Sequence, residues 1–233
     1  MKIDMIEDPW QKTSQCERCG IRNLVLFADL TKDDFDLMHR PISDLELKPG
    51  ATLFNTGDTP DFVYTLRQGL VKLVKYTDKG QQRIVRLLHQ GDLVGIEALN
   101  GQAYDHYAQA LTSISVCRIP VAEIERINFH SPRLYRQLTS RWSKMAREAD
   151  YWIADLLSGT AHTRVIQLLL YLASKSDTEQ FYLPSREDMG AMLAITTETA
   201  SRTIASLRGQ KVLNVLSDHQ ATADLEQLRL LIR

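Results

Sequence analysis

The chain has 233 residues and a formal net charge of −1, with 44% hydrophobic and 24% charged residues. This length predicts two domains, and this composition excludes an intrinsically disordered chain. Because no apolar run approaches the ~18 residues of a membrane-spanning helix and the acidic N-terminus lacks the apolar stretch of a signal peptide, we expect a cytoplasmic protein with no membrane association.

Residues 1–25 are predicted to form a polar arm that carries two of the three cysteines, Cys16 and Cys19. The third, Cys117, lies far along the chain in an apolar segment. A low, odd number of cysteines argues against a disulfide scaffold. A lone cysteine in an apolar strand is most often simply buried, whereas a Cys-Glu-Arg-Cys dithiol in a polar arm suits a redox switch.

Residues 26–120 are predicted to form an antiparallel β-roll. From Leu45 to Pro120, short apolar and β-branched segments alternate with turns, as in VKLVKY from Val71 and RIVRLL from Arg83. Most of the turn glycines are 10–12 residues apart, a spacing typical of a roll or barrel. A roll of this kind has room for a small ligand. The turn glycines are Gly50, Gly57, Gly69, Gly80, Gly91 and Gly101.

Residues 121–158 are predicted to form a long helix. This stretch holds no glycine, and its apolar residues recur at alternating intervals of three and four, which is the a/d seam of a coiled coil. Such a stripe can pack on the chain's own roll. A helix of this length outspans one small domain, so we favour pairing with the same helix of a second copy in a homodimer. The predicted seam consists of Leu138, Trp142, Met145, Ala149, Trp152 and Leu156, with Tyr135 before them.

Residues 159–233 are predicted to form a second domain, which follows a joint at Gly159. An apolar helix comes first. Ser185 then offers an N-cap to the first of two short helical segments. A strand over residues 212–216, a turn and a short terminal helix follow. This order of elements is that of a winged helix-turn-helix.

The second short helix is predicted to read DNA. Its exposed face carries Glu198, Ser201 and Arg202, and residues four apart project from one side of a helix. In a major groove the guanidinium can donate to guanine O6 and N7, and the carboxylate can accept from cytosine N4. The plainer alternative is an ordinary surface ion pair. The hydroxyls predicted to meet phosphates belong to Thr197, Thr199 and Thr203.

The turn before this helix departs from the usual pattern. Such a turn requires a left-handed residue, and Ala194 stands where glycine would be natural. The substitution costs on the order of 1 kcal/mol, which the fold can tolerate. Gly190 is the small residue expected where the two helices cross closely.

The segment Thr197–Arg202, which reads TETASR, resembles the recognition-helix signature E-x-x-S-R of the CRP/FNR family. The resemblance extends over nearly the whole chain. The segment GDLVGIEAL from Gly91 is similar to the family's strand and turn below the effector pocket. The segments YAQAL from Tyr107 and VCRIP from Val116 are similar to its FNR branch.

This resemblance implies an α+β fold with an N-terminal cyclic-nucleotide-binding-like β-roll, a dimerisation helix and a C-terminal winged helix-turn-helix. It implies a homodimer on double-stranded DNA, in which Glu198, Ser201 and Arg202 contact an inverted repeat similar to TTGAT-N4-ATCAA. It also implies contact between RNA polymerase and surface loops of the roll, including the loop around residues 78–80. That loop reads equally well as a plain hairpin turn.

The resemblance leaves the effector of the roll open. Cyclic-nucleotide pockets of the family use a glutamate followed by an arginine-serine pair. Glu97 stands at a plausible glutamate position, but no arginine follows it, and Asp105 would repel a phosphate. Cyclic AMP is therefore not the expected ligand.

An iron–sulfur cluster is the second candidate, because FNR-type sensors hold one on four thiolates. Cys16, Cys19 and Cys117 match three of those ligands, and Val25 stands where another is expected. A cubane cluster on this chain would therefore need a further ligand. Zinc on the same thiols, haem and plain thiol redox chemistry remain alternatives.

Two other functional classes are possible. A metal-using enzyme of the cupin type needs a compact set of histidine and glutamate ligands, whereas His89 and His106 stand alone. A regulatory cyclic-nucleotide-binding-like module without DNA binding is disfavoured by the missing arginine and by the C-terminal reading helix. We therefore expect a transcription regulator without enzymatic activity.

Overall fold

The computed structural model describes residues 26–39 and 42–232, so the predicted arm of residues 1–25 lies outside the described residues. The chain divides into two compact units. The first comprises the described residues up to 75 together with residues 86–144, and the second comprises residues 76–85 and 145–232. None of the helices in this part of the chain is long and apolar enough to cross a membrane.

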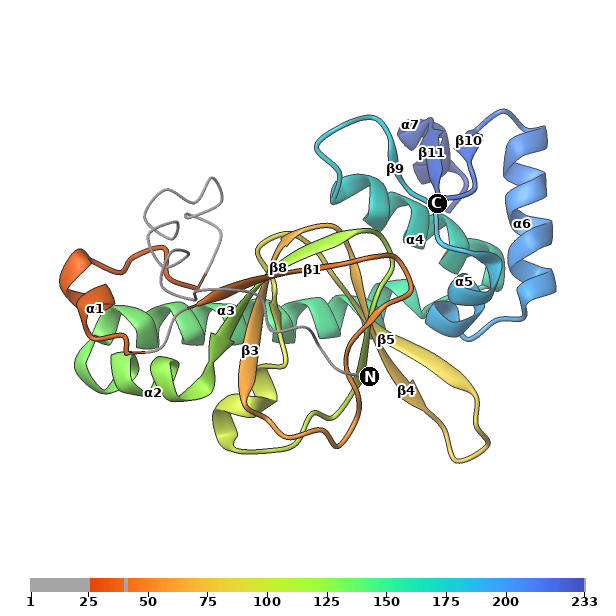
Figure 1. Cartoon of the computed structure of the whole chain (residues 1–233). Helices are drawn as coiled ribbons and strands as arrows, with labels where there is room; N and C mark the ends of the chain where they lie inside the picture. The colour runs from red at the N-terminus through yellow and green to blue at the C-terminus, as the bar shows by residue number, and fades with distance from the viewer. Residues whose placement is uncertain (1–25, 40–41, 233) are drawn as a thin grey trace. The chain divides into compact units, whose positions relative to one another are not determined.

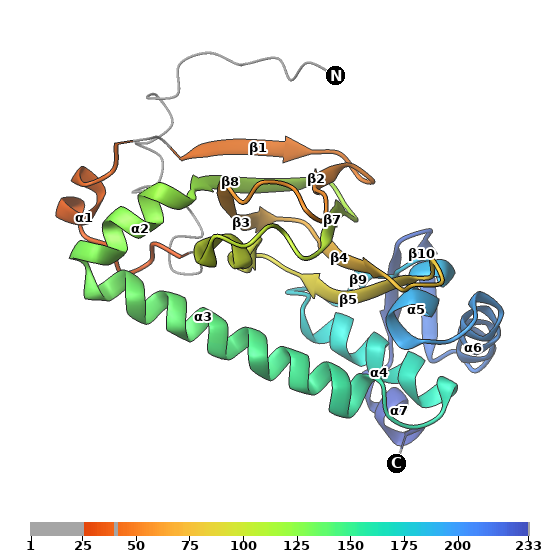
Figure 2. The same ribbon diagram turned by 90° about the horizontal axis from the view of Figure 1, so that it is seen from below.

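The first unit contains the predicted antiparallel β-roll (Figures 1 and 2). Its strands form two four-stranded sheets in the orders β1-β8-β3-β6 and β2-β7-β4-β5. The tip of the β4–β5 hairpin is grouped with the second unit. The elements are β1 (Ser43–Leu47), β2 (Thr52–Phe54), β3 (Phe62–Gln68), β4 (Val71–Tyr76), β5 (Gln82–Leu88), β6 (Leu93–Val94), η3 (Ile96–Asn100), β7 (Tyr107–Ala110) and β8 (Ile114–Pro120).

An aromatic cluster fills the space between the two sheets beside Gly95. The rings of Phe54 on β2 and Tyr64 on β3 lie 6.0 Å apart, so the cluster joins both sheets. Tyr104 stacks on Phe54 with 3.9 Å between centroids and donates to the carbonyl of Phe62 at 2.6 Å. Burial raises the pKa of Tyr104, so its hydroxyl remains a donor. A Cβ on Gly95 would lie 2.6 Å from the Tyr104 ring, which explains the glycine.

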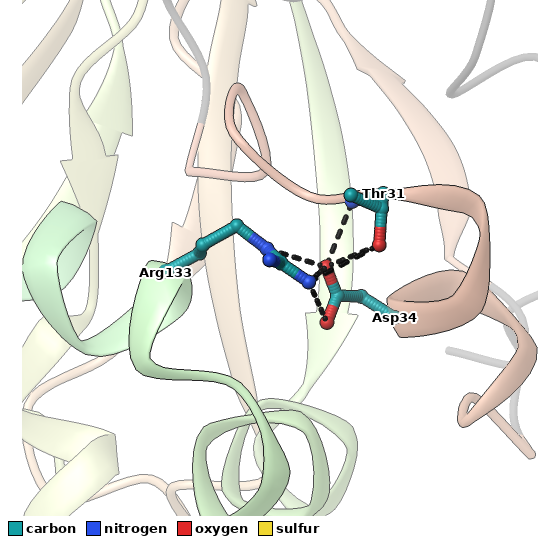
Figure 3. A network of polar contacts seen from close by, with 3 residues as sticks. All are labelled: Thr31, Asp34 and Arg133. Atoms are coloured by element: carbon teal, nitrogen blue, oxygen red, sulfur yellow. Dashed lines mark hydrogen bonds and ion pairs between the residues drawn. The ribbon is translucent and has the colours of Figure 1, made fainter.

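A buried carboxylate binds the short helix α1 (Lys32–Asp36) to the start of helix α3 (Pro132–Tyr151) (Figure 3). Asp34 is 5% exposed and accepts from the backbone N–H of Thr31 at 2.7 Å and from its hydroxyl at 2.9 Å. Arg133 on α3 donates to the same carboxylate through Nε at 3.1 Å and Nη2 at 3.2 Å. The network therefore ties the N-terminal part of the described chain to α3.

Two helices, α2 (Val121–His130) and α3 (Pro132–Tyr151), replace the single helix predicted over residues 121–158. Pro132 has no N–H to donate, and it forces Ser131 into an extended conformation with φ −124° and ψ 108°. The prediction of one uninterrupted helix is therefore wrong at Ser131. A π-helix, η4 (Trp152–Leu156), follows α3 directly and carries the end of the predicted seam.

Helix α3 is bound to the turn between β5 and β6. Arg141 Nη1 donates to the carbonyl of Gly91 at 3.1 Å, and Lys144 Nζ lies 2.6 Å from Asp92 Oδ1. Asp92 is 7% exposed, and its second oxygen accepts from the backbone N–H of His89 at 2.8 Å. Two charged side chains of α3 therefore bind the turn between β5 and β6 within the first unit, one through a backbone carbonyl and one through a carboxylate.

The second unit contains the predicted winged helix-turn-helix, which confirms the α+β fold class. Helix α4 packs against α5, α6 and α7, and three strands form a small sheet in the order β10-β11-β9. Its elements are α4 (Ala161–Ser174), β9 (Phe181–Tyr182), α5 (Arg186–Leu193), α6 (Thr197–Gly209), β10 (Leu213–Ser217), β11 (Gln220–Ala223) and α7 (Leu225–Leu230).

Candidate nucleic-acid interface

Helices α5 and α6 are joined by a tight turn with a capping residue at each helix start. The Ser185 hydroxyl accepts from the N–H of Asp188 at 3.0 Å, and the Thr196 hydroxyl accepts from the N–H of Thr199 at 3.1 Å. Between the helices, Ala194 has a φ of 56°, which is the left-handed conformation predicted for this position. The start of α6 is thus fixed by the hydroxyl of Thr196.

The two helices cross at Gly190. A Cβ on Gly190 would lie 2.8 Å from the backbone oxygen of Ile195, so no larger residue fits without movement of the turn. The inner faces of the helices are buried, and this leaves the opposite face of α6 in solvent. The buried apolar residues are Met189, Leu193, Ala200, Ile204 and Leu207.

The outer face of α6 carries the predicted reading residues. The side chains of Glu198 and Arg202 are 71% and 78% exposed, and Arg202 Nη2 lies 2.6 Å from Glu198 Oε1. Ser201 is exposed beside them. An exposed pair at this spacing contributes only about 0.3–0.5 kcal/mol to stability, so it can open readily when other partners are offered.

The three threonines predicted to meet phosphates differ in their surroundings. Thr197 is exposed in the first turn of α6, and the Thr199 hydroxyl lies 2.8 Å from that of Thr196. Thr203 is 7% exposed and donates to the carbonyl of Thr199 at 3.0 Å. Thr203 therefore does not fit the predicted phosphate contact, because it lies on the inner face, three residues after the buried Ala200.

A β-hairpin follows α6 where a wing is expected. Strand β10 pairs antiparallel with β11, which in turn pairs with β9. In the hairpin turn, the ring of His219 stacks on Tyr182 with 5.4 Å between centroids, and its Nδ1 lies 3.2 Å from the carbonyl of Leu183. These contacts fix the turn to β9. The second unit therefore offers a recognition helix and a wing together.

Residues 44–129 match the family model for cyclic nucleotide-binding domains, and residues 163–231 match that for Crp-like helix-turn-helix domains. The chain is 31% identical over 199 residues to the transcriptional activator protein FnrA of Stutzerimonas stutzeri, with 82% of each protein covered. This chain belongs to the CRP/FNR family of transcription regulators.

A further relative and a solved structure also match this CRP/FNR regulator over most of its length. The transcriptional activator protein anr of Pseudomonas aeruginosa is 31% identical, over 81% of this chain and 80% of its own length. The structure of FixK2 from Bradyrhizobium japonicum has the same fold, with a TM-score of 0.75 and 24% identity, over 82% of this chain and 98% of that one. The matched helix-turn-helix includes α5 and α6, so the regulator binds DNA through its second unit.

Of the three cysteines of the CRP/FNR regulator, only Cys117 lies in the described part of the chain. It is half-buried on β8, its Sγ lies 3.9 Å from Asp44 Oδ1, and Asp44 pairs with Arg67 at 2.8 Å. Within residues 26–39 and 42–232, no three histidine, cysteine, aspartate or glutamate side chains are grouped to hold a metal ion. Cys16 and Cys19 lie outside the described residues, so a cluster or zinc on the three thiols stays a prediction.

Glu97, the predicted pocket glutamate of the regulator, already contacts neighbouring residues of the roll. Its Oε1 accepts from the N–H of Asp105 at 3.2 Å and lies 3.6 Å from His106 Nδ1. Burial would raise the pKa of Glu97, but the nearby His106 and the hydrogen bonds from backbone N–H groups outweigh it and hold the pKa below its ordinary value. The carboxylate is therefore charged and already partnered in the roll.

The seam residues predicted for the dimer fall into two groups. Some are buried within the chain itself, and Trp152 packs edge-on against Tyr171 of α4. The aromatic residues nearer the start of α3 remain accessible. Leu138, Trp152 and Leu156 are buried, Met145 and Ala149 are half-buried, and Tyr135 and Trp142 are exposed.

Sequence reasoning missed Arg164, which lies in the first turn of α4. Its Nη1 donates to the carbonyl of Leu193 at the end of α5, at 3.1 Å. The signal was present in the sequence, since Arg164 is the one arginine of an otherwise strongly apolar helix. The hydrogen-bond partner of Arg164 could not be predicted, because a backbone carbonyl 29 residues away is not indicated by any side chain in the sequence.

Replacing Ala194 by glycine is expected to raise the free energy of unfolding by about 0.5–1 kcal/mol, since glycine adopts the left-handed conformation without strain. Urea denaturation of the full chain measures the change. Ala205→Gly is the matched control, because Ala205 is an exposed residue inside α6 and its replacement should lower stability by a similar amount. A lower free energy of unfolding in Ala194→Gly would show that Ala194 is not strained in its left-handed conformation.

Proposed function

We propose that this regulator acts as a homodimer on an inverted repeat similar to TTGAT-N4-ATCAA, under the control of a redox or small-molecule signal at the β-roll. The exposed pair Glu198 and Arg202 on α6 carries the proposal. An arginine can donate to guanine O6 and N7, while a glutamate one turn earlier accepts from cytosine N4. Ser201 lies on the same exposed face, and Thr197 at the helix start is available to a phosphate.

Helix α3 supports the homodimer. Tyr135 and Trp142 are 62% and 42% exposed, and their spacing of seven residues places them on one side of the helix. A groove between η3, α2 and α3 opens beside Trp142, with Leu99 and Ile124 in its lining. A second α3 on this side would cover both rings, and the two-fold axis would set two copies of α6 on two half-sites.

The contacts between the roll and α3 support control by a signal. Arg141 and Lys144 bind the turn at Gly91 and Asp92, so a change inside the roll that moves this turn also moves α3, on which the proposed dimer depends. Cys117 places a thiol in the same roll. The exposed hairpin turn at residues 78–80 is the proposed contact with RNA polymerase.

Equilibrium binding at physiological salt tests the operator. The duplex TTGAT-N4-ATCAA is expected to bind about 1,000-fold more tightly than a scrambled duplex of equal composition. Analytical ultracentrifugation should show two chains on each duplex. Equal affinity for the two duplexes would contradict the half-site, and one chain per duplex would contradict the homodimer.

Anaerobic purification with iron, zinc and sulfide analysis tests the nature of the signal. Iron and acid-labile sulfide in a coloured protein would identify a cluster. A colourless protein without iron after anaerobic reconstitution would assign the control to the thiols themselves or to an organic effector. Loss of the metal in a Cys117→Ser variant would show that the thiol on β8 is one of its ligands.

A further inference from the structure

Arg164 connects two parts of the second unit that are distant in sequence. Its Nη1 donates to the carbonyl of Leu193 at 3.1 Å, and its Nε donates to the carbonyl of Gly159 at 3.2 Å. Leu193 is the last residue of α5, and Gly159 is the left-handed residue between η4 and α4, with a φ of 79°. The guanidinium of Arg164 therefore connects the backbone at Gly159 to the end of α5 in the helix-turn-helix.

Both ends of this bridge are held by further contacts. Thr163 packs against Gly159, since a Cβ there would lie 3.2 Å from its Cγ2, and the Thr160 hydroxyl caps α4 by accepting from the N–H of Thr163 at 3.2 Å. On the other side, Leu193 is followed by the left-handed Ala194. Gly159 is thus fixed to the start of α4, and Arg164 extends this connection to the turn between α5 and α6.

The chemistry of the Leu193 end suits a guanidinium. Carbonyls in the last turn of a helix lack intrahelical donors, and the C-terminal end of the helix dipole favours a positive charge. Two planar N–H groups of arginine can reach two carbonyls at once, which a lysine ammonium does with less geometric definition. Only two residues separate Leu193 from Thr196, the cap of α6.

We propose that Arg164 is a positioning residue, which sets the start of recognition helix α6 relative to the left-handed turn at Gly159. The inference rests on the DNA-binding role of α6 but assigns no base or phosphate to Arg164. Base-edge contacts require placement within about 0.5 Å, so a turn that loses one of its anchors reads the operator less well.

The test uses the full chain as wild type, Arg164→Ala and Arg164→Lys, with Arg229→Ala as the matched loss of one exposed arginine from the same unit. Affinity for TTGAT-N4-ATCAA and for the scrambled duplex is measured over a range of salt. Arg164→Ala should weaken binding to the operator about tenfold, because the start of α6 is then held less firmly in the position from which it reads base edges. Scrambled binding and the salt dependence should stay unchanged. Arg164→Lys should recover part of the loss, and Arg229→Ala should match wild type.

Two outcomes would overturn the proposal. Equal loss on both duplexes with a shallower salt dependence would make Arg164 a phosphate contact. A lowered melting temperature with unchanged operator affinity would make it a purely structural residue. If Arg164→Ala fails to fold, Arg164→Lys decides alone, because a positioning role requires it to lose operator affinity without losing scrambled binding.

Hydrogen exchange without DNA separates this proposal from the operator itself. The N–H of Ile195, which donates to the carbonyl of Gly190 at 3.3 Å, should exchange about tenfold faster in Arg164→Ala than in wild type, and the acceleration should be smaller in Arg164→Lys. Amides in the middle of α6 should be unaffected. If the wild-type protein binds TTGAT-N4-ATCAA no better than the scrambled duplex, the proposed operator is wrong. If the exchange rate of the Ile195 amide is unchanged in Arg164→Ala, the proposed positioning role of Arg164 is wrong.

Discussion

Replacing Arg202 by alanine is expected to weaken binding to the proposed operator by about 1–3 kcal/mol, which is roughly a 5- to 150-fold rise in Kd. The guanidinium is 78% exposed and pairs with Glu198 on the surface of α6, so its removal leaves the helix core intact. A bidentate contact from arginine to guanine reads one base, so the variant should also lose its preference at one base pair of each half-site. Binding to duplexes with each base pair replaced in turn measures both effects.

The control for this experiment is Arg229→Ala, which removes the same charge from the exposed side of α7. Its affinity for every duplex should stay within about twofold of wild type. An Arg202→Ala variant with the base preferences of wild type would show that α6 reads DNA through other side chains. Loss of affinity equally for all duplexes would make Arg202 a phosphate contact rather than a base contact.

Replacing Asp34 by alanine is expected to lower the free energy of unfolding by about 2–3 kcal/mol, because it leaves the donors of Thr31 and Arg133 without their acceptor. Asp34 is 5% exposed, and four hydrogen bonds from these two residues converge on it (Figure 3). Urea denaturation followed by circular dichroism measures the loss. Asp36→Ala on the exposed side of the same helix is the matched control and should change little. Equal stability of the two variants would show that the network does not hold α1 to α3.

The same carboxylate predicts a dependence of stability on pH. Burial alone would raise the pKa of Asp34, but the hydrogen bonds from Thr31 and Arg133 hold it below its ordinary value of 3.8. The unfolded chain therefore takes up this proton first as pH falls. Its contribution to stability is complete above pH 3.8 and is lost as pH drops through the lower value of the folded state. Asp34→Ala should show a flatter decline than wild type in this acid range, and parallel declines would contradict the assignment.

Local chemistry made much of the fold predictable. The turn glycines at intervals of 10–12 residues marked the strand ends because left-handed turns favour glycine, and Gly50, Gly69 and Gly91 all have φ between 81° and 89°. Ala194 was expected to be left-handed from its place between two helical patterns, and it is. Such features depend on neighbouring residues alone, and a single sequence contains them.

Contacts between distant residues were not predictable in the same way. Nothing in the pattern pairs Asp34 with Arg133, which are 99 residues apart, or Arg164 with the carbonyl of Leu193. The break at Pro132 was visible in the sequence, but the absence of glycine from residues 121–158 and the helical spacing of the apolar residues after it suggested a continuous helix. Thr203 was predicted to meet a phosphate because of its hydroxyl, although its spacing of three residues from Ala200 places it on the buried face of α6.

The stack of Tyr104 on Phe54 imposes a condition on any molecule that enters the roll beside Gly95. That volume already holds an aromatic ring whose hydroxyl donates to Phe62 and whose edge touches the glycine turn. A guest there must displace the Tyr104 ring and break its hydrogen bond to the carbonyl of Phe62. Admission of a ligand at this place and displacement of the ring are therefore one event, in which the ligand competes with the protein's own tyrosine.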